Sequence, residues 1–542
     1  SMLGGGATTC AYSDWLAADV IVFIGSNVSN NQPVATKYLH YAKKNGAQVL
    51  VVNPYREPGM ERYWIPSVPE SALFGTKLAD RFYGVRPGGD AAFLGGVLKA
   101  LIERGHCDEA FIQAHTDGFD EVRGHLAALP WESLEKGSGL ARSEMEDLAH
   151  RLGTAHRGVL VWSMGITQHA NGVDNVRAIV NLGLARGYVG REGCGLMPIR
   201  GHSGVQGGAE MGAYATAFPG GNAVTPENAA SLSEQWGFPV PNSPGLNAPE
   251  MIEAAARGEL DVLFSVGGNF LEVLPDPDFV ESAIASIPLR VHFDLVSSSQ
   301  MLVDPADTVV LLPAVTRYET PGGVTQTTTE RRVIFSPEVR GRRIGEARPE
   351  WEVFLELARR IRPDHAGALA FDSTAAVRSE IAKVVAMYDG IQRLAKRGDQ
   401  FQYGGPHLCE GGTYQTPTGR AQFAPVNTSE PIVRDELFTV VTRRGKQFNS
   451  MVHESRDALT GAEREAVLMS PDDARELGVA QGDRVRLTSD FGMYEGVAYL
   501  APLSPGSLQV HWPEVNRLLD RACRSADAGI PDYNARVRIE KR

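Results

Sequence analysis

The sequence predicts an α/β protein with doubly wound parallel sheets, followed by a small mainly-β barrel. Over residues 19–313, short apolar runs alternate with helical stretches, and the runs end in glycine, proline or a polar residue. This pattern is typical of buried parallel strands that are connected by helices. After residue 435 the pattern changes to short strands separated by turn residues, which favours a barrel.

The first strand–helix–strand unit lies near the N-terminus. Residues 19–25 form an apolar run closed by Gly25, residues 35–45 are helical, and residues 48–54 form a second apolar run. A helix between two such runs indicates a βαβ crossover. The pattern recurs as a strand over 158–165 with a helix over 173–187 behind it, and as strands over 261–267, 289–294 and 308–313.

The C-terminal part is expected to consist mainly of short strands. We place them at residues 438–443, 484–489, 495–500 and 507–512, with one short helix at 471–477. Residues 397–435, which precede them, are rich in glycine, proline and threonine. We therefore expect an irregular connection between the α/β part and the barrel.

Length and charge limit the classes of function. The 542 residues are enough for roughly three or four domains. Because 53 Lys and Arg stand against 65 Asp and Glu, for a net charge of −12, we expect no nucleic-acid partner. No run reaches the ~18–20 apolar residues that a membrane helix needs, so we expect no direct membrane insertion.

The cysteines and histidines predict no metal site held by protein side chains alone. The five cysteines form no CxxC pair, and the 13 histidines show no paired ligand spacing. Isolated thiols and the absence of a signal-peptide pattern favour the cytoplasm. Ser1 precedes Met2, and we expect a residual tag residue or a fragment boundary there.

Glycines and polar side chains follow the predicted strands. In doubly wound sheets, ligands bind beyond the carboxyl ends of the strands, so these residues predict a large nucleotide ligand, or two. The alternative is that they are ordinary polar turns. Neither GxGxxG nor GxxxxGK[ST] is present, so the usual NAD and ATP motifs are absent. The residues are Gly25, Asn27, Asn53, Arg56, Gly88, Asp90, Met164, Gln168, Gly267, Asn269, Asp294 and Ser298.

A glycine-rich segment over residues 194–212 surrounds Arg200 and His202. So many glycines disfavour a helix or a plain strand, and we expect a tight loop that places both side chains inside a cavity. An arginine in such a place can hold a small carboxylate with two parallel hydrogen bonds. The alternative is a flexible surface loop.

Several segments resemble motifs of one enzyme family. Residues 198–207 resemble its PVRGxxNVQG segment, 164–168 its MGxTQ, 416–423 its TPxGxAQF, and 477–485 its LGIxDGDxV. Residues 442–450 are similar to a subgroup of it, and the matches run in order from about residue 4 to 540. The chain therefore resembles the oxidoreductases that use molybdopterin guanine dinucleotide, in the branch of the formate dehydrogenase alpha subunits.

This resemblance implies a bis(molybdopterin guanine dinucleotide) cofactor that holds molybdenum or tungsten through four dithiolene sulfurs. It implies two-electron oxidation of formate to carbon dioxide, with electrons passed to another domain or subunit. Arg200 would bind the formate carboxylate, and His202 would orient substrate and tune charge. Met164, Gln168 and Gly201 would also lie beside the metal. One dinucleotide would contact Gly25, Asn27, Asn53, Arg56, Gly88 and Asp90; the other Gly267, Asn269, Asp294 and Ser298, with Gln447, Asn449, His511 and Asn516 from the barrel.

The resemblance also implies a domain division. It comprises an α/β dinucleotide-binding domain over 1–202, a second over 203–365 without its N-terminal half, a helical segment and irregular connector over 366–430, and a double-psi β-barrel over 431–542. The metal-ligating Cys or selenocysteine would lie upstream of Ser1, as would any iron–sulfur cluster not held by a partner. We therefore expect this chain alone to be inactive.

Other functions remain open on the sequence. A non-catalytic cofactor-binding or assembly protein would keep the same binding residues without the metal ligand. A nitrate-reductase-like member of the same scaffold would also share them, because one arginine does not specify formate. A different nucleotide-binding α/β enzyme would bind no pterin.

Overall fold

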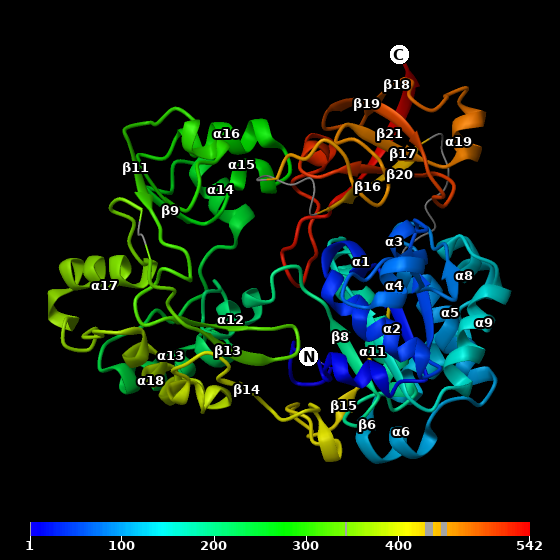
Figure 1. Ribbon diagram of the computed structural model, residues 1–542, viewed down its shortest axis with the longest axis horizontal. Helices are drawn as coiled ribbons and strands as arrows, with labels where there is room; N and C mark the ends of the chain where they lie inside the picture. Colours follow the sequence, from blue (N-terminus) through cyan, green and yellow to red (C-terminus); the bar gives the residue numbers. More distant parts are fainter. Residues whose placement is uncertain (1, 342–343, 429–436, 446–451) are drawn as a thin grey trace. The chain divides into compact units, whose positions relative to one another are not determined.

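The computed structural model describes residues 2–341, 344–428, 437–445 and 452–542 (Figure 1). Contacts divide the chain into two units, which are described separately. The first unit comprises Ser1–Gly201 with Pro406–Arg542, and the second comprises His202–Gly405. The four-domain division expected from the resemblance stays a prediction.

The first unit contains a five-stranded parallel sheet with the strand order β5-β2-β1-β7-β8. The central strands β1 (Val20–Ile24) and β7 (Gly158–Trp162) are buried along their whole length. β2 (Gln48–Val52) and β5 (Arg81–Tyr83) lie on one side of them, and β8 (Gly195–Pro198) lies on the other. The predicted βαβ unit over residues 19–54 is confirmed.

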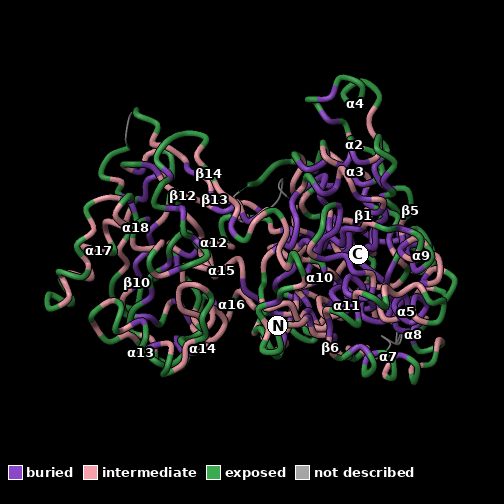
Figure 2. Tube along the Cα trace, turned by 90° about the horizontal axis from the view of Figure 1, so that it is seen from below, coloured by how far each residue is buried: buried purple, intermediate pink, exposed green. Residues whose placement is uncertain are grey.

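Helices cover both faces of this sheet, which explains why its strands are apolar throughout. Val22 and Leu50 belong to the core under α5 (Asp90–Glu103), α9 (Arg142–Thr154) and α11 (Gly172–Ala185). Phe23 and Val49 belong to the opposite core, under α2 (Thr36–Lys44). Figure 2 shows the buried segments around β1 and α11. The doubly wound architecture is therefore confirmed.

Short elements complete this α/β domain and connect its strands. The helices are η1 (Tyr12–Leu16), α1 (Val28–Asn31), α3 (Pro58–Glu61), α4 (Pro69–Phe74), α6 (Glu109–His115), α7 (Phe119–Ala128), α8 (Trp131–Ser138) and α10 (Met164–Thr167); the strands are β3 (Arg62–Tyr63), β4 (Thr76–Lys77) and β6 (Thr116–Asp117).

The connector after residue 405 packs against this α/β domain instead of running free. β15 (Ala421–Gln422) pairs with β6, and Tyr414 and Phe423 join the domain's core. The His407 ring also contacts the buried Asp14 carboxylate at 2.8 Å. Part of the segment expected to be irregular therefore contains a short strand that tertiary contacts stabilise.

The C-terminal domain is a closed six-stranded barrel with the order β16-β20-β17-β19-β18-β21. The predicted strands are present as β16 (Phe438–Arg443), β18 (Arg484–Thr488), β19 (Met493–Leu500) and β20 (Ser507–His511), with α19 (Pro471–Glu476) as the short helix. The barrel also contains β17 (Ala466–Met469) and β21 (Asn534–Lys541), which the sequence did not predict. A barrel is therefore confirmed, and it needs these two strands to close.

The barrel packs against the carboxyl end of β2. Tyr55 forms an isolated β-bridge with Leu503, and the Ser504 amide donates to the Pro54 carbonyl at 2.8 Å. Beside them, both Nη atoms of Arg443 donate to Glu57, at 2.6 and 3.0 Å. The two side chains are only 5% and 8% exposed, so the ion pair is buried.

The second unit contains a three-stranded parallel sheet of β9 (Val262–Val266), β10 (Leu289–Asp294) and β11 (Thr308–Pro313). The prediction of consecutive parallel strands over 261–313 is confirmed. One core beside this sheet includes Ile252 of α14 (Ala248–Ala256) and Val280 of α16 (Pro277–Ala285). Further elements of this unit include α13 (Pro226–Trp236), α15 (Phe270–Val273), α17 (Glu350–Ile361), α18 (Thr374–Val384) and an antiparallel sheet of β12 (Val324–Thr327), β13 (Arg332–Ser336) and β14 (Gln400–Gln402).

The prediction that residues 194–212 contain no helix or strand is wrong. Gly195–Pro198 is strand β8, and Gly204–Glu210 is helix α12. The helix forms because neighbours hold its middle and its C-terminal end: the Gly207 amide donates to the Thr327 hydroxyl at 3.0 Å, and the Glu210 carboxylate accepts from Tyr403 at 2.6 Å and from Tyr388. These contacts override the low helix propensity of glycine.

Within the described ranges, no helix combines the length and the apolar character that crossing a membrane requires.

Breaking the Glu57–Arg443 pair should destabilise the first unit strongly. Arg443→Met leaves a buried carboxylate without its partner, so we expect the unfolding free energy to fall by about 3–5 kcal/mol. Urea denaturation followed by tryptophan fluorescence measures the loss. The double variant Glu57→Leu/Arg443→Met should lose less than Arg443→Met alone, because no uncompensated charge remains.

The matched control is Arg475→Gln in the same domain, which removes an exposed pair with Asp472. It should change the unfolding free energy by about 1 kcal/mol or less. Equal effects of Arg443→Met and Arg475→Gln would contradict a structural role for the buried pair.

Candidate functional site

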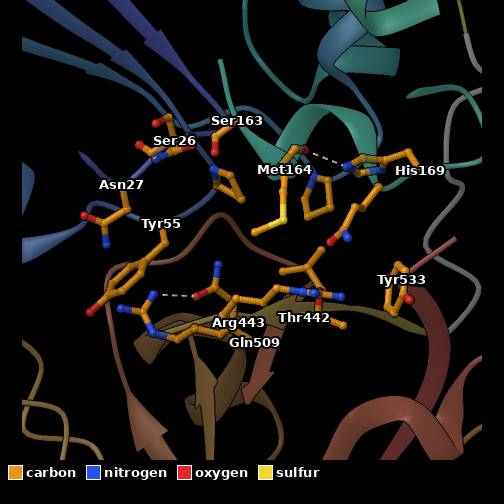
Figure 3. Close-up of a pocket in the computed structure, with 18 of the residues that line it drawn as sticks. Ser26, Asn27, Tyr55, Ser163, Met164, His169, Thr442, Arg443, Gln509 and Tyr533 are labelled. Carbon is orange, nitrogen blue, oxygen red and sulfur yellow. Dashed lines mark hydrogen bonds between the residues drawn. The ribbon is translucent and has the colours of Figure 1, made fainter. Parts of the chain in front are cut away.

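A polar cavity of about 140 Å³ lies where the carboxyl ends of β1, β2 and β7 meet the barrel. The cavity is large enough to hold several water molecules or a polar group of a ligand. Figure 3 shows Asn27, Ser163 and Met164 of the α/β domain on one side, and Thr442, Arg443 and Gln509 of the barrel on the other.

Two glycines let the loops after β1 and β7 approach each other. Gly25 has φ +57°, and a Cβ on it would lie 2.8 Å from the carbonyl carbon of Gly165. A Cβ on Gly165 would lie 2.6 Å from the Gly25 oxygen, to which the Gly165 amide donates at 3.2 Å. Side chains at either position would therefore separate the two loops that form this wall of the cavity.

Asn27 and Asn53 line the same wall. The Asn27 Oδ1 accepts from the Ser29 hydroxyl at 2.9 Å and from the Asn30 amide at 3.3 Å. Asn53 donates through Nδ2 to the Ser26 carbonyl at 3.2 Å. These bonds use the Asn27 oxygen and the Asn53 nitrogen. The Asn27 Nδ2 can therefore donate a hydrogen bond to a ligand, and the Asn53 Oδ1 can accept one.

Asp90 is a buried carboxyl group at the start of α5 and lines the cavity. Burial raises its pKa to about 6, while His169 acts in the opposite direction. The His169 ring places Nε2 2.8 Å from the Gly165 carbonyl and Nδ1 3.0 Å from the Asn534 Nδ2. A neutral ring with its proton on Nε2 satisfies both contacts, and Asn534 then connects this wall to the barrel.

The barrel wall carries two neighbouring arginines. Arg443 is neutralised by Glu57, donates to the Gln509 Oε1 at 3.3 Å, and lies 5.1 Å from the Tyr55 ring centre. Burial lowers the pKa of Arg444, whose guanidinium lies 4.3 Å from the Trp512 ring and 4.7 Å from the Tyr533 ring. Its Nε and Nη2 are buried and have no hydrogen-bond partner among the described residues.

Several residues predicted from the sequence do line this cavity: Gly25, Asn27, Asn53, Asp90, Met164 and Gln168. Arg56 is exposed and pairs with Glu61 at 2.6 Å, although its neighbours Tyr55 and Glu57 line the cavity. Gly88 lies in the loop before Asp90, with φ +79°.

The predicted barrel residues are placed elsewhere. His511 and Asn516 are buried but do not line the cavity. Burial lowers the His511 pKa to about 4, and its Nδ1 contacts the Arg464 carbonyl at 3.0 Å. Gln447 and Asn449 lie outside the described residues.

Arg200, Gly201 and His202 do not line this cavity either. The Arg200 Nη2 donates to the Gly6 carbonyl at 3.0 Å, and the Gln32 amide donates to the Arg200 carbonyl. Gly201 and His202 are exposed, and His202 begins the second unit.

The residues predicted for a second dinucleotide gather at the carboxyl edge of β9 and β10. Gly267 has φ +65° and directly follows β9. Asn269 accepts from the Glu272 amide at 3.3 Å and donates to the Ser299 hydroxyl at 3.1 Å. Asp294 ends β10, and the buried Ser298 Oγ has no hydrogen-bond partner within the described part of the chain.

The sequence interpretation missed residues that only the folded chain brings together. Tyr55, Glu57, His169, Arg444 and Tyr533 line the cavity without having been assigned to it. The sequence did contain one indication that Arg444 belongs to the site. It follows Arg443 at the end of a predicted strand, and two adjacent arginines there need an acidic partner or a ligand.

Two protein-family profiles match the chain. The family profile of the molybdopterin oxidoreductases matches residues 3–360, and that of the molybdopterin dinucleotide-binding domain matches residues 437–536. The chain belongs to the molybdopterin oxidoreductase family. The two matches cover the first α/β domain, most of the second unit and the barrel.

Relatives of this molybdopterin oxidoreductase align along nearly its whole length. Protein YdeP of Escherichia coli K12 is 30% identical over 98% of this chain and 73% of its own. The F420-dependent formate dehydrogenase 1 subunit alpha of Methanococcus maripaludis is 28% identical over 99% of this chain and 78% of its own. Acetylene hydratase from Pelobacter acetylenicus shares the fold, with a TM-score of 0.70 at 17% identity over all of this chain and 80% of its own.

The lining of the cavity suits the nucleotide part of a molybdopterin dinucleotide. Its amide side chains, buried carboxyl and glycine-lined wall suit a polar heterocycle and a ribose, and the buried nitrogens of Arg444 suit an anion. Among the described residues, no cluster of three or more His, Cys, Asp or Glu side chains is arranged to hold a metal.

Asp90 should make the stability of the cofactor-free protein depend on pH. Its pKa is about 6 when folded against 3.8 for the free side chain, so the folded state binds more protons between these values. The unfolding free energy should therefore fall as pH rises from about 4 to 6, by about 3 kcal/mol. Asp90→Asn should remove this fall and be the more stable protein at pH 7.

Urea denaturation of both proteins at pH 4.5 and pH 7.5 tests this expectation. Asp490→Asn, which changes an exposed barrel residue, should behave like the unmodified chain. An Asp90→Asn variant with the same pH dependence as the unmodified chain would contradict the assignment.

Proposed function

We propose that this chain is the cofactor-binding body of a formate dehydrogenase-like enzyme with a bis(molybdopterin guanine dinucleotide) cofactor. The cavity between the strand ends and the barrel carries the proposal. One of its walls holds the buried carboxyl of Asp90, and the other holds Arg444, whose Nε and Nη2 atoms are buried and have no hydrogen-bond partner among the described residues. Membership of the molybdopterin oxidoreductase family supports the binding of a pterin cofactor. The name of one relative, a formate dehydrogenase alpha subunit, supports the reaction.

The lining favours guanine as the base. Guanine presents two adjacent donors, N1–H and the N2 amino group, and one carboxylate accepts both in parallel. Asp90 is the buried carboxyl group of the cavity that is not already paired with an arginine, and we assign the guanine edge to it. Adenine offers a donor beside an acceptor at the corresponding edge, so an ionised Asp90 would discriminate against it. The residues at the ends of β9 and β10 would contact the second dinucleotide.

Arg200 is the proposed formate-binding residue. A planar guanidinium binds a carboxylate with two parallel N–H donors, which leaves the formate C–H directed away from the arginine. The main chain at Arg200 is held by the Gln32 amide, and Tyr12 donates to the Gln32 Oε1, so the orientation of that amide is fixed. His202 is the second proposed catalytic residue and would tune the charge near the substrate.

When bound, the molybdenum or tungsten cofactor supplies the two-electron redox chemistry that converts formate into carbon dioxide and a proton. This chain's residues bind the dinucleotides and orient the substrate. An electron-accepting domain or subunit takes the electrons, and any iron–sulfur cluster would belong to it or to a preceding segment. We place the protein in the cytoplasm.

Arg200→Ala tests the reaction most sharply, in the complete cofactor-loaded enzyme that contains this chain. Loss of the two-point grip on formate should lower kcat/KM by about 100-fold or more, with the pterin content unchanged. The measurement is formate-dependent reduction of a viologen dye. Arg200→Lys should retain more activity than Arg200→Ala, and Arg475→Ala should retain all of it.

Unchanged formate turnover in Arg200→Ala would contradict the role of Arg200. Nitrate-dependent oxidation of the reduced dye in place of formate oxidation would identify a nitrate-reductase-like enzyme. Full cofactor content without turnover of either substrate would identify a cofactor-binding protein that is not a catalyst.

A further inference from the structure

Arg200 and His202, the two proposed catalytic residues, belong to different units of the fold. Arg200 lies at the end of the first segment of the first unit, and His202 begins the second unit. The first unit holds the main chain at Arg200, because the Gln32 amide donates to the Arg200 carbonyl. The His202 side chain is exposed, so burial does not fix it. Contacts within the second unit hold the main chain next to it.

One side chain, Thr327, holds the segment that follows His202. The Thr327 hydroxyl donates to the Ser203 carbonyl at 2.9 Å and accepts from the Gly207 amide at 3.0 Å. It therefore bridges a carbonyl and an amide that would bond directly in a regular α-helix. The Ser203 and Thr329 hydroxyls lie 3.1 Å apart beside this bridge, and Thr327 is buried. The bridge fixes the first turn of α12, which starts directly after Ser203.

Thr327 is supported by a rigid part of the second unit. It is the last residue of β12, and Val333, its partner on β13, belongs to a buried core with Tyr388 and Tyr403. The same two tyrosines donate to the Glu210 carboxylate at the C-terminal end of α12. α12 lies beside this sheet (Figure 1), and residues of the sheet and of its core hold the helix there.

Gly207 shows how closely Thr327 approaches the helix. A Cβ on Gly207 would lie 2.9 Å from the Thr327 Cγ2 and 3.1 Å from its Oγ1. A Cβ on the neighbouring Gly208 would meet no described atom of another element within 4 Å. Of these two adjacent glycines, Gly207 is the one that must lack a side chain so that the hydroxyl can reach the main chain.

We propose that Thr327 is a positioning residue for His202. Its hydroxyl fixes the first turn of α12 and thereby the direction in which the main chain presents the His202 side chain. This inference rests on the proposed function, because it takes His202 to be catalytic. The two proposed catalytic residues then have separate supports, Gln32 for Arg200 and Thr327 for His202. Thr327 itself needs no contact with the substrate or the cofactor.

Hydrogen exchange in the cofactor-free chain tests the positioning without any enzyme activity. Thr327→Val keeps the shape of the side chain but removes the hydroxyl, so the Gly207 amide loses its acceptor. Peptides that cover residues 202–208 should therefore exchange about 10-fold faster, as measured by mass spectrometry. Thr327→Ser keeps the hydroxyl and should exchange like the unmodified chain. Thr320→Val removes another buried hydroxyl of the same unit and should leave these peptides unchanged.

Activity of the complete cofactor-loaded enzyme tests the consequence for His202. Thr327→Val should lower kcat for formate about 10- to 100-fold, because the His202 side chain is no longer directed. The KM for formate should change little, because Gln32 still holds Arg200. In the His202→Ala background, Thr327→Val should cause little further loss, since no side chain remains to be positioned. A threonine that only stabilised the fold would lower kcat by the same factor in both backgrounds.

Gly207→Ala is a second variant, which keeps the hydroxyl. Its methyl group would push α12 away from Thr327, although alanine favours a helix more than glycine does. It should therefore lower kcat as Thr327→Val does. Gly208→Ala is the matched control: its methyl group has space, so kcat should stay the same. Urea denaturation of each variant reports its folding.

Unchanged hydrogen exchange over residues 202–208 in a folded Thr327→Val protein, or the same loss of kcat in both backgrounds, would overturn the positioning role and leave the proposed function standing. If Thr327→Val does not fold, the two glycine variants decide, and equal kcat of Gly207→Ala and Gly208→Ala would overturn the role. Unchanged formate turnover in His202→Ala would overturn the catalytic role of His202 and this inference with it.

Discussion

The buried ion pair between Glu57 and Arg443 is the constraint on which the cavity depends. Two charges can leave water together only if each satisfies the other, and the bidentate contact of an arginine with a carboxylate tolerates little displacement. The pair therefore holds the end of β16 at the carboxyl end of β2, where the main-chain contacts of Pro54 and Tyr55 with the barrel lie. The walls formed by the α/β domain and by the barrel face each other because of it.

Much of this fold follows from the sequence, since buried parallel strands are apolar along their length and the residues after them must turn. Local sequence alone was enough to predict the strands over 19–25 and 48–54. The same holds for the polar residues Asn27 and Asn53 that follow them. Asp90 and Gln168 were found for a similar reason, because they follow glycine-containing turns near predicted strand ends.

The parts of the fold and of the site that the sequence did not predict depend on contacts between residues far apart in the chain. His169 lines the cavity because Asn534, which is contributed by the barrel, fixes its ring, and Arg444 is defined by Trp512 and Tyr533. Helix α12 forms in a glycine-rich segment because Thr327 holds its middle and Tyr388 and Tyr403 hold its C-terminal end. No local pattern encodes such contacts, so the positions of Arg200 and His202 outside the described cavity could not be derived from their motif.

We propose above that this chain binds molybdopterin guanine dinucleotide, with a nucleotide in the cavity between the parallel sheet and the barrel. The most direct test of this proposal is chemical analysis of the chain purified from cells that make the cofactor: pterin by fluorescence after oxidation, the nucleotide released by acid, and molybdenum or tungsten by elemental analysis. We expect pterin and guanine nucleotide in equal amounts, close to two of each per chain, together with one metal. A chain that carries no pterin, or pterin with a nucleotide other than guanine, would contradict it.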